Sequence, residues 1–132
     1  METIMSATPK SRVTNSLAQK KSRIEKIKAL NDAFRKDPEP SNVFISLEVV
    51  RLGEKKVEEL LAKLKTYSAF TAKTDHDGDY STGVIQLGPH KIDWGIFYMD
   101  LDEEEDSPDP SNPSVTSRIL NCLLYTSPSP RD

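Results

Sequence analysis

The fold of the chain is decided by residues 84–100, which read VIQLGPHKIDWGIFYMD. Gly88-Pro89 is a turn dipeptide, and the residues on either side of it are rich in β-branched and aromatic types. The stretch predicts two paired strands, over residues 84–87 and 91–100. One face of the second strand carries Ile92, Trp94, Ile96 and Tyr98, and the other carries Phe97 and Met99. Because both faces hold large apolar side chains, we expect both to be partly covered, with Trp94 and Tyr98 in the core.

Two helices and a further strand are predicted before this hairpin. Ser16 and Gln19 have capping-box spacing, and the prolines after residue 36 end a helix over residues 16–36. Alternating apolar residues over 43–50 predict a strand with one apolar face. Residues 54–67 predict the clearest helix of the chain. The apolar stripe of the first helix is Leu17, Ile24, Ile27, Leu30 and Phe34, and that of the second is Val57, Leu60, Leu61 and Leu64.

A last helix is predicted after the hairpin. Asn112 followed by Pro113 is a strong N-cap and first-turn signal, with Val115, Ile119 and Leu120 facing inward. The element order then indicates an α+β fold, with a small antiparallel sheet of about three strands packed with about three helices. Residues 1–15 are polar and are predicted to be disordered, so the single domain spans residues 16–121.

The last eleven residues, 122–132, read CLLYTSPSPRD. They match, in frame, the translation of a transposase adaptor used to build sequencing libraries. Pro128 and Pro130 oppose a helix there, and the Ser/Pro alternation has nothing to bury. We interpret the segment as derived from the adaptor and set it apart from the fold; the alternative is a genuine disordered end. We also expect the native chain to continue differently after Asn121.

The composition indicates a small soluble domain. Apolar residues make up 36% of the 132 residues, which is enough for a modest core, and no run is long enough to suggest a membrane span. The N-terminus lacks the apolar stretch of a secretory signal. Cys122 is the only cysteine, so no internal disulfide can form. We therefore expect a cytoplasmic protein that does not contact a membrane.

The charge is distributed unevenly along the chain. Residues 1–36 carry nine Lys and Arg against three acids, and the remainder carries nine against eighteen. A solvated basic helix beside a solvated acidic loop explains this split. A helix that touches phosphate groups is the alternative. Its contacts would be Lys20, Lys21, Arg23, Lys26 and Lys28. Glu25 and Asp32 interrupt the basic series and argue against nucleic-acid binding.

Three blocks of the chain resemble the bacterial domain of unknown function 3768 family. Residues 30–35 (LNDAFR) are close to its LNDxFR opening, and residues 94–100 (WGIFYMD) resemble its WKIDYYD strand. Residues 107–120 (SPDPSNPSVTSRIL) match its ending, SPDPxDPxxTxRVL. The resemblance covers about residues 24–121 and implies a small protein of proteobacterial chromosomes, plasmids and other mobile elements, without an established activity. The matching residues that we interpret as structural are Asn31, Asp32, Phe34, Arg35, Trp94, Tyr98, Pro108, Pro110, Pro113, Thr116 and Arg118.

A polar loop at residues 74–83 departs from that family. It reads TDHDGDYSTG where the family has NDPxGEHDFG, so the histidine and the following aspartate of relatives are replaced. Asp75, Asp77 and Asp79 alternate like the first ligands of a calcium loop, with His76 among them. An EF-hand is excluded because its sixth residue must be glycine and its twelfth glutamate, whereas this chain has tyrosine and glutamine. A hydrated turn and adventitious divalent-metal binding remain open.

The acidic run over residues 100–106 has three interpretations. It is a solvated loop, a surface that imitates the phosphate charge of nucleic acid, or a magnesium site. The Ser-Pro-Asp-Pro sequence after it is interpreted as a rigid entry to the last helix, with a binding role as the alternative. The candidate interaction surface consists of Asp102, Glu103, Glu104, Glu105, Asp106, Ser107 and Asp109.

No nucleophile–base pair, phosphate-binding glycine loop or Cys/His zinc spacing is present in the sequence. We therefore expect no cofactor and a non-enzymatic accessory domain that binds another protein through its charged segments. One alternative is a metal-dependent or enzymatic protein that uses Asp75, Asp77 and Asp79. The other is contact with nucleic acid through the basic helix.

Overall fold

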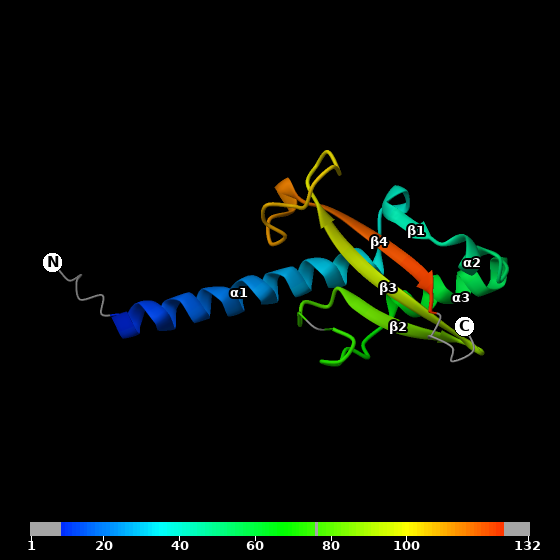
Figure 1. The fold of residues 1–132 in the computed structure, drawn as a ribbon, viewed down its shortest axis with the longest axis horizontal. Helices are drawn as coiled ribbons and strands as arrows, with labels where there is room; N and C mark the ends of the chain where they lie inside the picture. Colours follow the sequence, from blue (N-terminus) through cyan, green and yellow to red (C-terminus); the bar gives the residue numbers. More distant parts are fainter. Residues whose placement is uncertain (1–8, 76, 126–132) are drawn as a thin grey trace, which may run out of the picture.

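Three α-helices pack on a four-stranded sheet in the computed structural model, which describes residues 9–75 and 77–125 (Figure 1). The helices are α1 (Pro9–Lys36), α2 (Leu47–Val50) and α3 (Glu54–Lys65). The strands are β1 (Val43–Ile45), β2 (Thr82–Leu87), β3 (His90–Met99) and β4 (Ser117–Leu124). Two 3-10 turns, η2 (Pro40–Asn42) and η3 (Pro113–Val115), precede β1 and β4. The predicted α+β class is confirmed.

The strands follow the order β1-β4-β3-β2, so the sheet is mixed. β2 pairs with β3 and β3 pairs with β4 in antiparallel fashion, whereas β1 runs parallel to β4. About three antiparallel strands were expected, and the fourth arises because residues 117–124 form a strand. Their pairing with both β1 and β3 makes β4 a central strand.

The predicted hairpin is present. β2 and β3 pair from Leu87 opposite His90 to Thr82 opposite Gly95, and the turn between them is Gly88-Pro89. Gly88 has a φ of 60°, the left-handed conformation that glycine supplies at the first position of a two-residue hairpin turn. Gly83 has a different role. A Cβ there would lie 2.6 Å from the Tyr67 ring and 2.7 Å from Trp94 Nε1, so only glycine lets these rings approach the strand.

The core lies between one face of the sheet and the helices. Trp94 is 2% exposed, and Leu60, on α3, is fully buried, which confirms both as core residues. In Figure 1 α3 and the end of α1 lie behind the sheet. The core cluster consists of Val49, Leu60, Leu64, Ile85, Leu87, Ile92, Trp94, Ile96, Leu120 and Cys122. The stripe predicted for α3 thus faces this core, while Lys63 and Glu59 form an outward ion pair at 3.2 Å.

The opposite face of the sheet is open, which corrects the expectation that both faces of β3 are covered. Phe97 is 54% exposed, and Phe44 on β1 is 52% exposed. In β3 the residues alternate between buried and more exposed classes from Lys91 to Phe97, as expected for a strand with one covered face. The helices of residues 9–75 therefore pack on a single side of the sheet.

The strand predicted over residues 43–50 is wrong after Ile45. The chain leaves the sheet at Ser46, and the amides of Val49 and Val50 donate to the Ser46 carbonyl to form the single turn of α2. Val49 is fully buried, so the turn brings it into the core. A short apolar run is compatible with either strand or helix, and here tertiary packing decides.

The predicted last helix is also wrong. Asn112 does cap a turn, because its side chain accepts a hydrogen bond from the Ser114 amide at 3.0 Å. The turn ends after η3, and residues 117–122 alternate between partly buried and buried positions along β4. Eight paired positions with β3 satisfy the backbone of this segment, whereas a short helix would leave β3 with an unpaired edge.

Two boundaries of the predicted domain differ from the structure. Helix α1 begins at Pro9 instead of Ser16, so residues 9–15, expected to be disordered, are helical. Residues 122–124, set apart as adaptor-derived, belong to β4, and Cys122 is fully buried. The origin of the tail stays an interpretation, and residues 1–8 and 126–132 lie outside the described part of the chain. None of the helices in that part is long and apolar enough to span a bilayer.

Candidate interaction site

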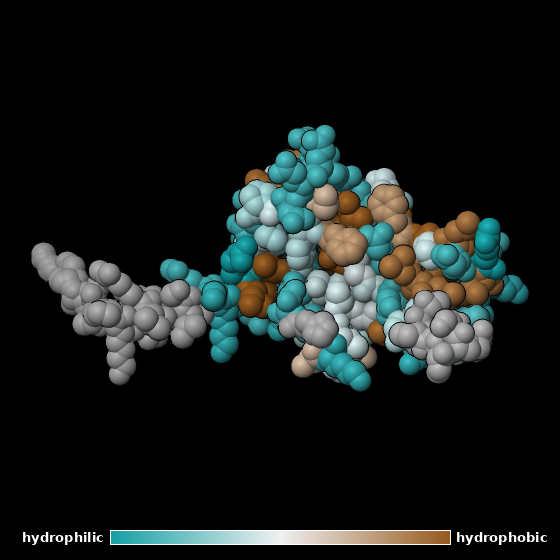
Figure 2. All heavy atoms as spheres, in the orientation of Figure 1, coloured by the Kyte–Doolittle hydropathy of each residue, from teal (hydrophilic) through white to brown (hydrophobic). Residues whose placement is uncertain are grey.

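The acidic run forms a tight hairpin that extends β3. Met99 bridges Asp106, and the Asp100 amide donates to the Glu105 carbonyl at 2.8 Å. Glu103 has a φ of 58°, and its carboxylate accepts from the Ser117 hydroxyl at 2.6 Å. Figure 2 shows this hairpin as a hydrophilic projection above the sheet. Residues 101–106 are all exposed, and five of them, residues 102–106, are acidic.

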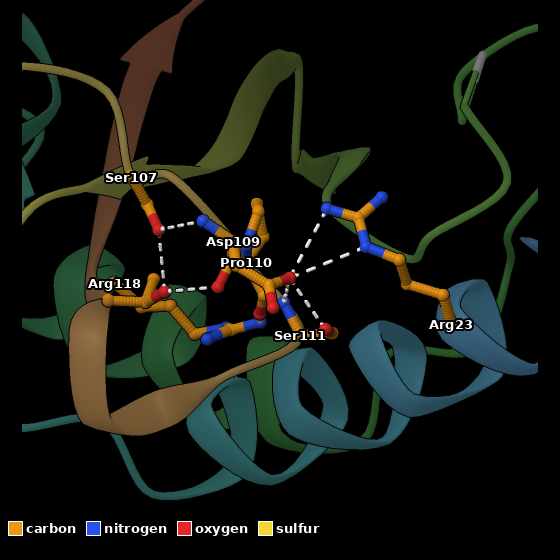
Figure 3. Close-up of polar contacts among 7 residues, drawn as sticks. Arg23, Ser107, Asp109, Pro110, Ser111 and Arg118 are labelled. Carbon is orange, nitrogen blue, oxygen red and sulfur yellow. Dashed lines mark hydrogen bonds and ion pairs between the residues drawn. The ribbon is translucent and has the colours of Figure 1, made fainter.

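The Ser-Pro-Asp-Pro segment that follows is held by its own hydrogen bonds (Figure 3). The Ser107 hydroxyl accepts from the Asp109 amide at 3.0 Å and lies 2.7 Å from the Thr116 hydroxyl. The Thr116 hydroxyl donates to the Asp109 carbonyl at 2.8 Å. The Arg118 Nη2 donates to the Pro110 carbonyl at 2.6 Å. These contacts place Ser107, Thr116 and Arg118 in the internal hydrogen-bond network of this segment.

Asp109 belongs to this internal network more than to a free surface. Its carboxylate accepts from the Ser111 hydroxyl at 2.6 Å and from the Ser111 amide at 3.1 Å. These hydrogen bonds, assisted by Arg23 of α1 at 3.3 Å, lower the pKa of Asp109. Asp109 therefore ties the loop to α1, and the exposed acids before Ser107 remain as the interaction candidates.

A buried polar network joins the loop region to α1. Asn31 is fully buried, and its amide nitrogen donates to the Asp79 carbonyl at 2.8 Å and to the Tyr98 hydroxyl at 2.7 Å. Its carbonyl oxygen accepts from Arg118 Nε at 2.6 Å. The Tyr98 hydroxyl in turn donates to the Asp79 carboxylate at 2.6 Å. Burial and this carboxylate raise the pKa of Tyr98, which keeps the hydroxyl protonated as a donor.

The three aspartates proposed for metal do not converge. Asp79 is buried, and its two carboxylate oxygens accept from Ser81 and Tyr98. Asp75 is buried with one oxygen unpartnered, whereas Asp77 is exposed. Burial raises the pKa of Asp75, and the neighbouring Asp79 adds to the effect. Among residues 9–75 and 77–125 no three potential ligands are grouped for a metal ion, and His76 lies outside the described residues.

Arg35 caps the end of α3 from α1. It is 1% exposed, and its Nε donates to the Leu64 carbonyl at 2.8 Å while its Nη2 donates to the Tyr67 carbonyl at 3.1 Å. The same Nη2 pairs with Asp32 at 2.6 Å. The guanidinium carbon lies 5.4 Å from the centroid of the Phe70 ring. Positive charge at the carboxyl end of a helix is favourable, which explains this position for a buried arginine.

The basic residues of α1 do not form one uninterrupted cationic surface. Arg23 pairs with Asp109 at 3.3 Å, and Lys28 pairs with Glu25 at 3.2 Å and lies over the Tyr80 ring. The other three candidates, Lys20, Lys21 and Lys26, are exposed. Figure 1 shows the first half of α1 extending away from the sheet.

An exposed apolar row on the open sheet face was missed at the sequence level. Phe97 of β3 lies opposite Ile119 of β4, and Phe44 of β1 lies opposite Asn121, two residues further along β4. The three apolar side chains thus occupy neighbouring positions on three adjacent strands. The available signal was the period-two pattern, which puts Phe97 on the face away from Trp94.

The comparisons with known proteins give a family but no activity. Residues 45–127 match the family model described as "Protein of unknown function (DUF3768)". The chain belongs to this family. The predicted resemblance is thereby confirmed, although the block at residues 30–35 lies before the matched range. No curated protein and no solved structure matches the chain.

Proposed function

We propose that this member of the family is a non-enzymatic accessory domain that binds a partner protein on the open face of its sheet. The observation that carries the proposal is the pair of aromatic side chains there, Phe44 and Phe97, each more than half exposed. Both come from strands, whose backbone is held by the sheet, so a partner would meet a preformed surface. Their strands flank β4, whose partly buried Ile119 lies opposite Phe97. Exposed apolar side chains grouped on one face are typical of protein-binding surfaces.

The acidic hairpin at residues 100–106 indicates the chemistry of the partner. It continues directly from β3, the strand that carries Phe97, and its residues 102–106 are acidic and exposed. A segment with apolar residues flanked by Lys or Arg would complement both features. The negative charge would accelerate association, and the aromatic residues would supply most of the affinity.

The family resemblance supports an accessory role in bacteria, including on mobile elements. The proposal places the protein in the cytoplasm, the compartment expected for a chain with a single, unpaired cysteine. The gene for the partner protein should then lie next to the gene for this protein's close relatives in bacterial genomes.

Selection of peptides against the chain tests the binding proposal. A displayed library of short random peptides is panned on the wild type alone, and the enriched peptides are then measured against both the wild type and a Phe44→Ser/Phe97→Ser variant. Enriched peptides should be basic and apolar and should lose about tenfold or more in affinity for that variant, because each buried aromatic contributes about 1.5–3 kcal/mol. Ile24→Ser, which removes an apolar residue of α1 that is 37% exposed, is the matched control.

Two outcomes would contradict the proposal. Peptides that bind wild type and the double variant equally would remove the open face as the site. The second outcome is binding of duplex DNA. If that binding falls steeply with salt and is lost in the Lys20→Gln/Lys21→Gln/Lys26→Gln variant, it supports the nucleic-acid alternative instead.

A further inference from the structure

The first part of α1 has no packing partner in the described part of the chain. Residues 18–26 are all exposed, and the first buried side chain among those described in this helix is Ile27. Figure 1 shows this part of α1 projecting away from the sheet. Ile24 is an apolar side chain there that is 37% exposed. Since most helical stability in proteins comes from tertiary packing, a partner would stabilise this part of the helix.

The projecting part of α1 and the acidic hairpin carry opposite charges of equal size. Residues 9–28 contain seven Lys and Arg against the single acid Glu25, a net charge of +6. Residues 100–106 contain six acids and no Lys or Arg, a net charge of −6. Lys20, Lys21 and Lys26 are exposed and form no ion pair among the described side chains.

These two surfaces do not neutralise each other within one chain. Arg23 pairs with Asp109, which follows the hairpin, at 3.3 Å. None of the ion pairs between described side chains involves residues 100–106. Because α1 is one continuous helix whose Ile27 and Asn31 are buried in the body of the protein, its first part cannot fold back onto the hairpin. A second molecule is needed to bring the two charges together.

A groove of about 370 Å³ lies between α1, the acidic hairpin and η3. Its apolar lining consists of Leu30, Phe34, Leu101 and Pro113. Leu101 is 63% exposed, so the groove is open to an incoming apolar side chain. The two charged lining residues, Glu39 and Arg118, have opposite signs, so the hairpin acids beside the groove make its surroundings negative.

We infer that two copies of the chain form a symmetric dimer in which residues 18–28 of each copy bind the acidic hairpin and the groove of the other. Lys20, Lys21 and Lys26 meet the hairpin acids, and Ile24 enters the groove. Since each copy holds both surfaces, a twofold axis forms the contact twice and doubles the buried area. Exposed ion pairs contribute at most about 1 kcal/mol each, so the charges direct association and the apolar contact adds affinity.

Sedimentation equilibrium of the full chain tests the dimer. The chain has a mass of 14.8 kDa, and the measured mass should approach twice that value as the concentration rises. Raising the salt concentration from about 0.05 M to about 0.5 M should weaken the association about tenfold or more, because salt screens exposed charges.

Reversal of charge shows which surfaces form the contact. The helix variant is Lys20→Glu/Lys21→Glu/Lys26→Glu. The hairpin variant is Asp102→Lys/Glu104→Lys/Glu105→Lys. All six positions are exposed, so both variants should fold. Each variant alone should be monomeric, because like charges then face each other. An equimolar mixture should form a 1:1 dimer, because the acidic helix meets the basic hairpin and the basic helix meets the acidic hairpin.

A third variant controls for net charge. Lys55→Glu/Lys65→Glu/Lys73→Glu has the same net charge as the helix variant, with the changes at exposed positions outside the contact. Alone it should dimerise like the wild type. It should bind the hairpin variant much more weakly than the helix variant does, because one of the two contacts would join a basic helix to a basic hairpin.

The inference shares the acidic hairpin with the proposed function but does not use Phe44 or Phe97. Phe44→Ser/Phe97→Ser should therefore leave the dimer unchanged, so the two proposals can fail separately. A chain that stays monomeric at low salt overturns the inference. So does a mixture of helix and hairpin variants that stays monomeric, or a dimer that Phe44→Ser/Phe97→Ser abolishes. A monomeric chain that binds duplex DNA through the three lysines would also overturn it, in favour of nucleic acid.

Discussion

Replacing Asn31 by alanine should destabilise the protein more than any exposed substitution. The side chain is fully buried; its hydrogen bonds with the Asp79 carbonyl and with Arg118 are buried too, and the one to the Tyr98 hydroxyl is partly buried. Two are neutral bonds worth about 1 kcal/mol each, and the bond from Arg118 involves a charge and is worth about 1.5–3 kcal/mol. Asn31→Ala should therefore lower the free energy of unfolding by about 3–5 kcal/mol, a large part of the total for a domain of this size.

The coupling between Asn31 and Arg118 is the sharper test. Arg118→Met keeps the aliphatic part of the side chain and removes the hydrogen bond to Asn31. Burial lowers the pKa of Arg118, whereas Tyr98 and the Asp79 carboxylate raise it. The charged form of the guanidinium is therefore stabilised by these partners. A double-mutant cycle of Asn31→Ala and Arg118→Met should give a coupling free energy of about 1.5–3 kcal/mol.

Urea unfolding followed by Trp94 fluorescence measures the free energy of unfolding of the wild type and of the three variants in this cycle. Trp94 is the only tryptophan and is 2% exposed, so its emission reports loss of the core. The Arg23–Asp109 pair, which is exposed, is the control, and its coupling should disappear at high salt. A coupling between Asn31 and Arg118 below about 0.5 kcal/mol would refute the reasoning, because that is the scatter expected of independent sites.

Three further predictions concern the loop at residues 74–81 and the β2–β3 hairpin. Burial raises the pKa of Asp75, so its contribution to stability is complete below its ordinary pKa near 3.8 and is lost as pH rises through the folded-state pKa. Asp75→Asn should therefore match the wild type in thermal stability at about pH 3 and exceed it at neutral pH; a difference independent of pH would contradict this cause. Gly83→Ala should cost about 1–3 kcal/mol, because its Cβ would overlap the Tyr67 ring at 2.6 Å. Gly95→Ala, whose Cβ would meet nothing closer than 3.8 Å, is the matched control in the same urea assay. Calorimetric titration with calcium, magnesium and manganese should give no heat at millimolar metal, since both carboxylate oxygens of Asp79 already accept hydrogen bonds. Heat that disappears in Asp77→Asn would restore the metal interpretation.

The hairpin and the α3 helix were predictable because their signals are local. A turn dipeptide flanked by β-branched residues, and an apolar stripe at helical spacing, each depend on neighbours within a few positions. The same local rules failed at residues 46–50 and 117–121, where a short apolar run is compatible with both helix and strand. Asn112 illustrates the difficulty: it caps a turn as predicted, yet the chain continues as a strand because β3 offers a partner.

The candidate sites depended still more on contacts between distant residues. The charge of the acidic run could be predicted directly, since five consecutive acidic residues, 102–106, need no particular fold to be charged. The sequence could not show whether Asp75, Asp77 and Asp79 converge. The carboxylate of Asp79 accepts from Ser81 and also from Tyr98 of β3, which is distant along the chain. The groove beside the acidic hairpin joins residues from α1, the hairpin and η3, so no window of sequence contains it.

The sequence by itself determined the family, the α+β class, the hairpin and the charge of the acidic run, since each follows from composition or from neighbours along the chain. Only the tertiary structure decided that β4 is a strand, that one sheet face is open, and which buried polar groups have partners. The physical reason is that strand pairing and burial are free energies shared between segments far apart in the chain. A local pattern can permit these arrangements without selecting among them.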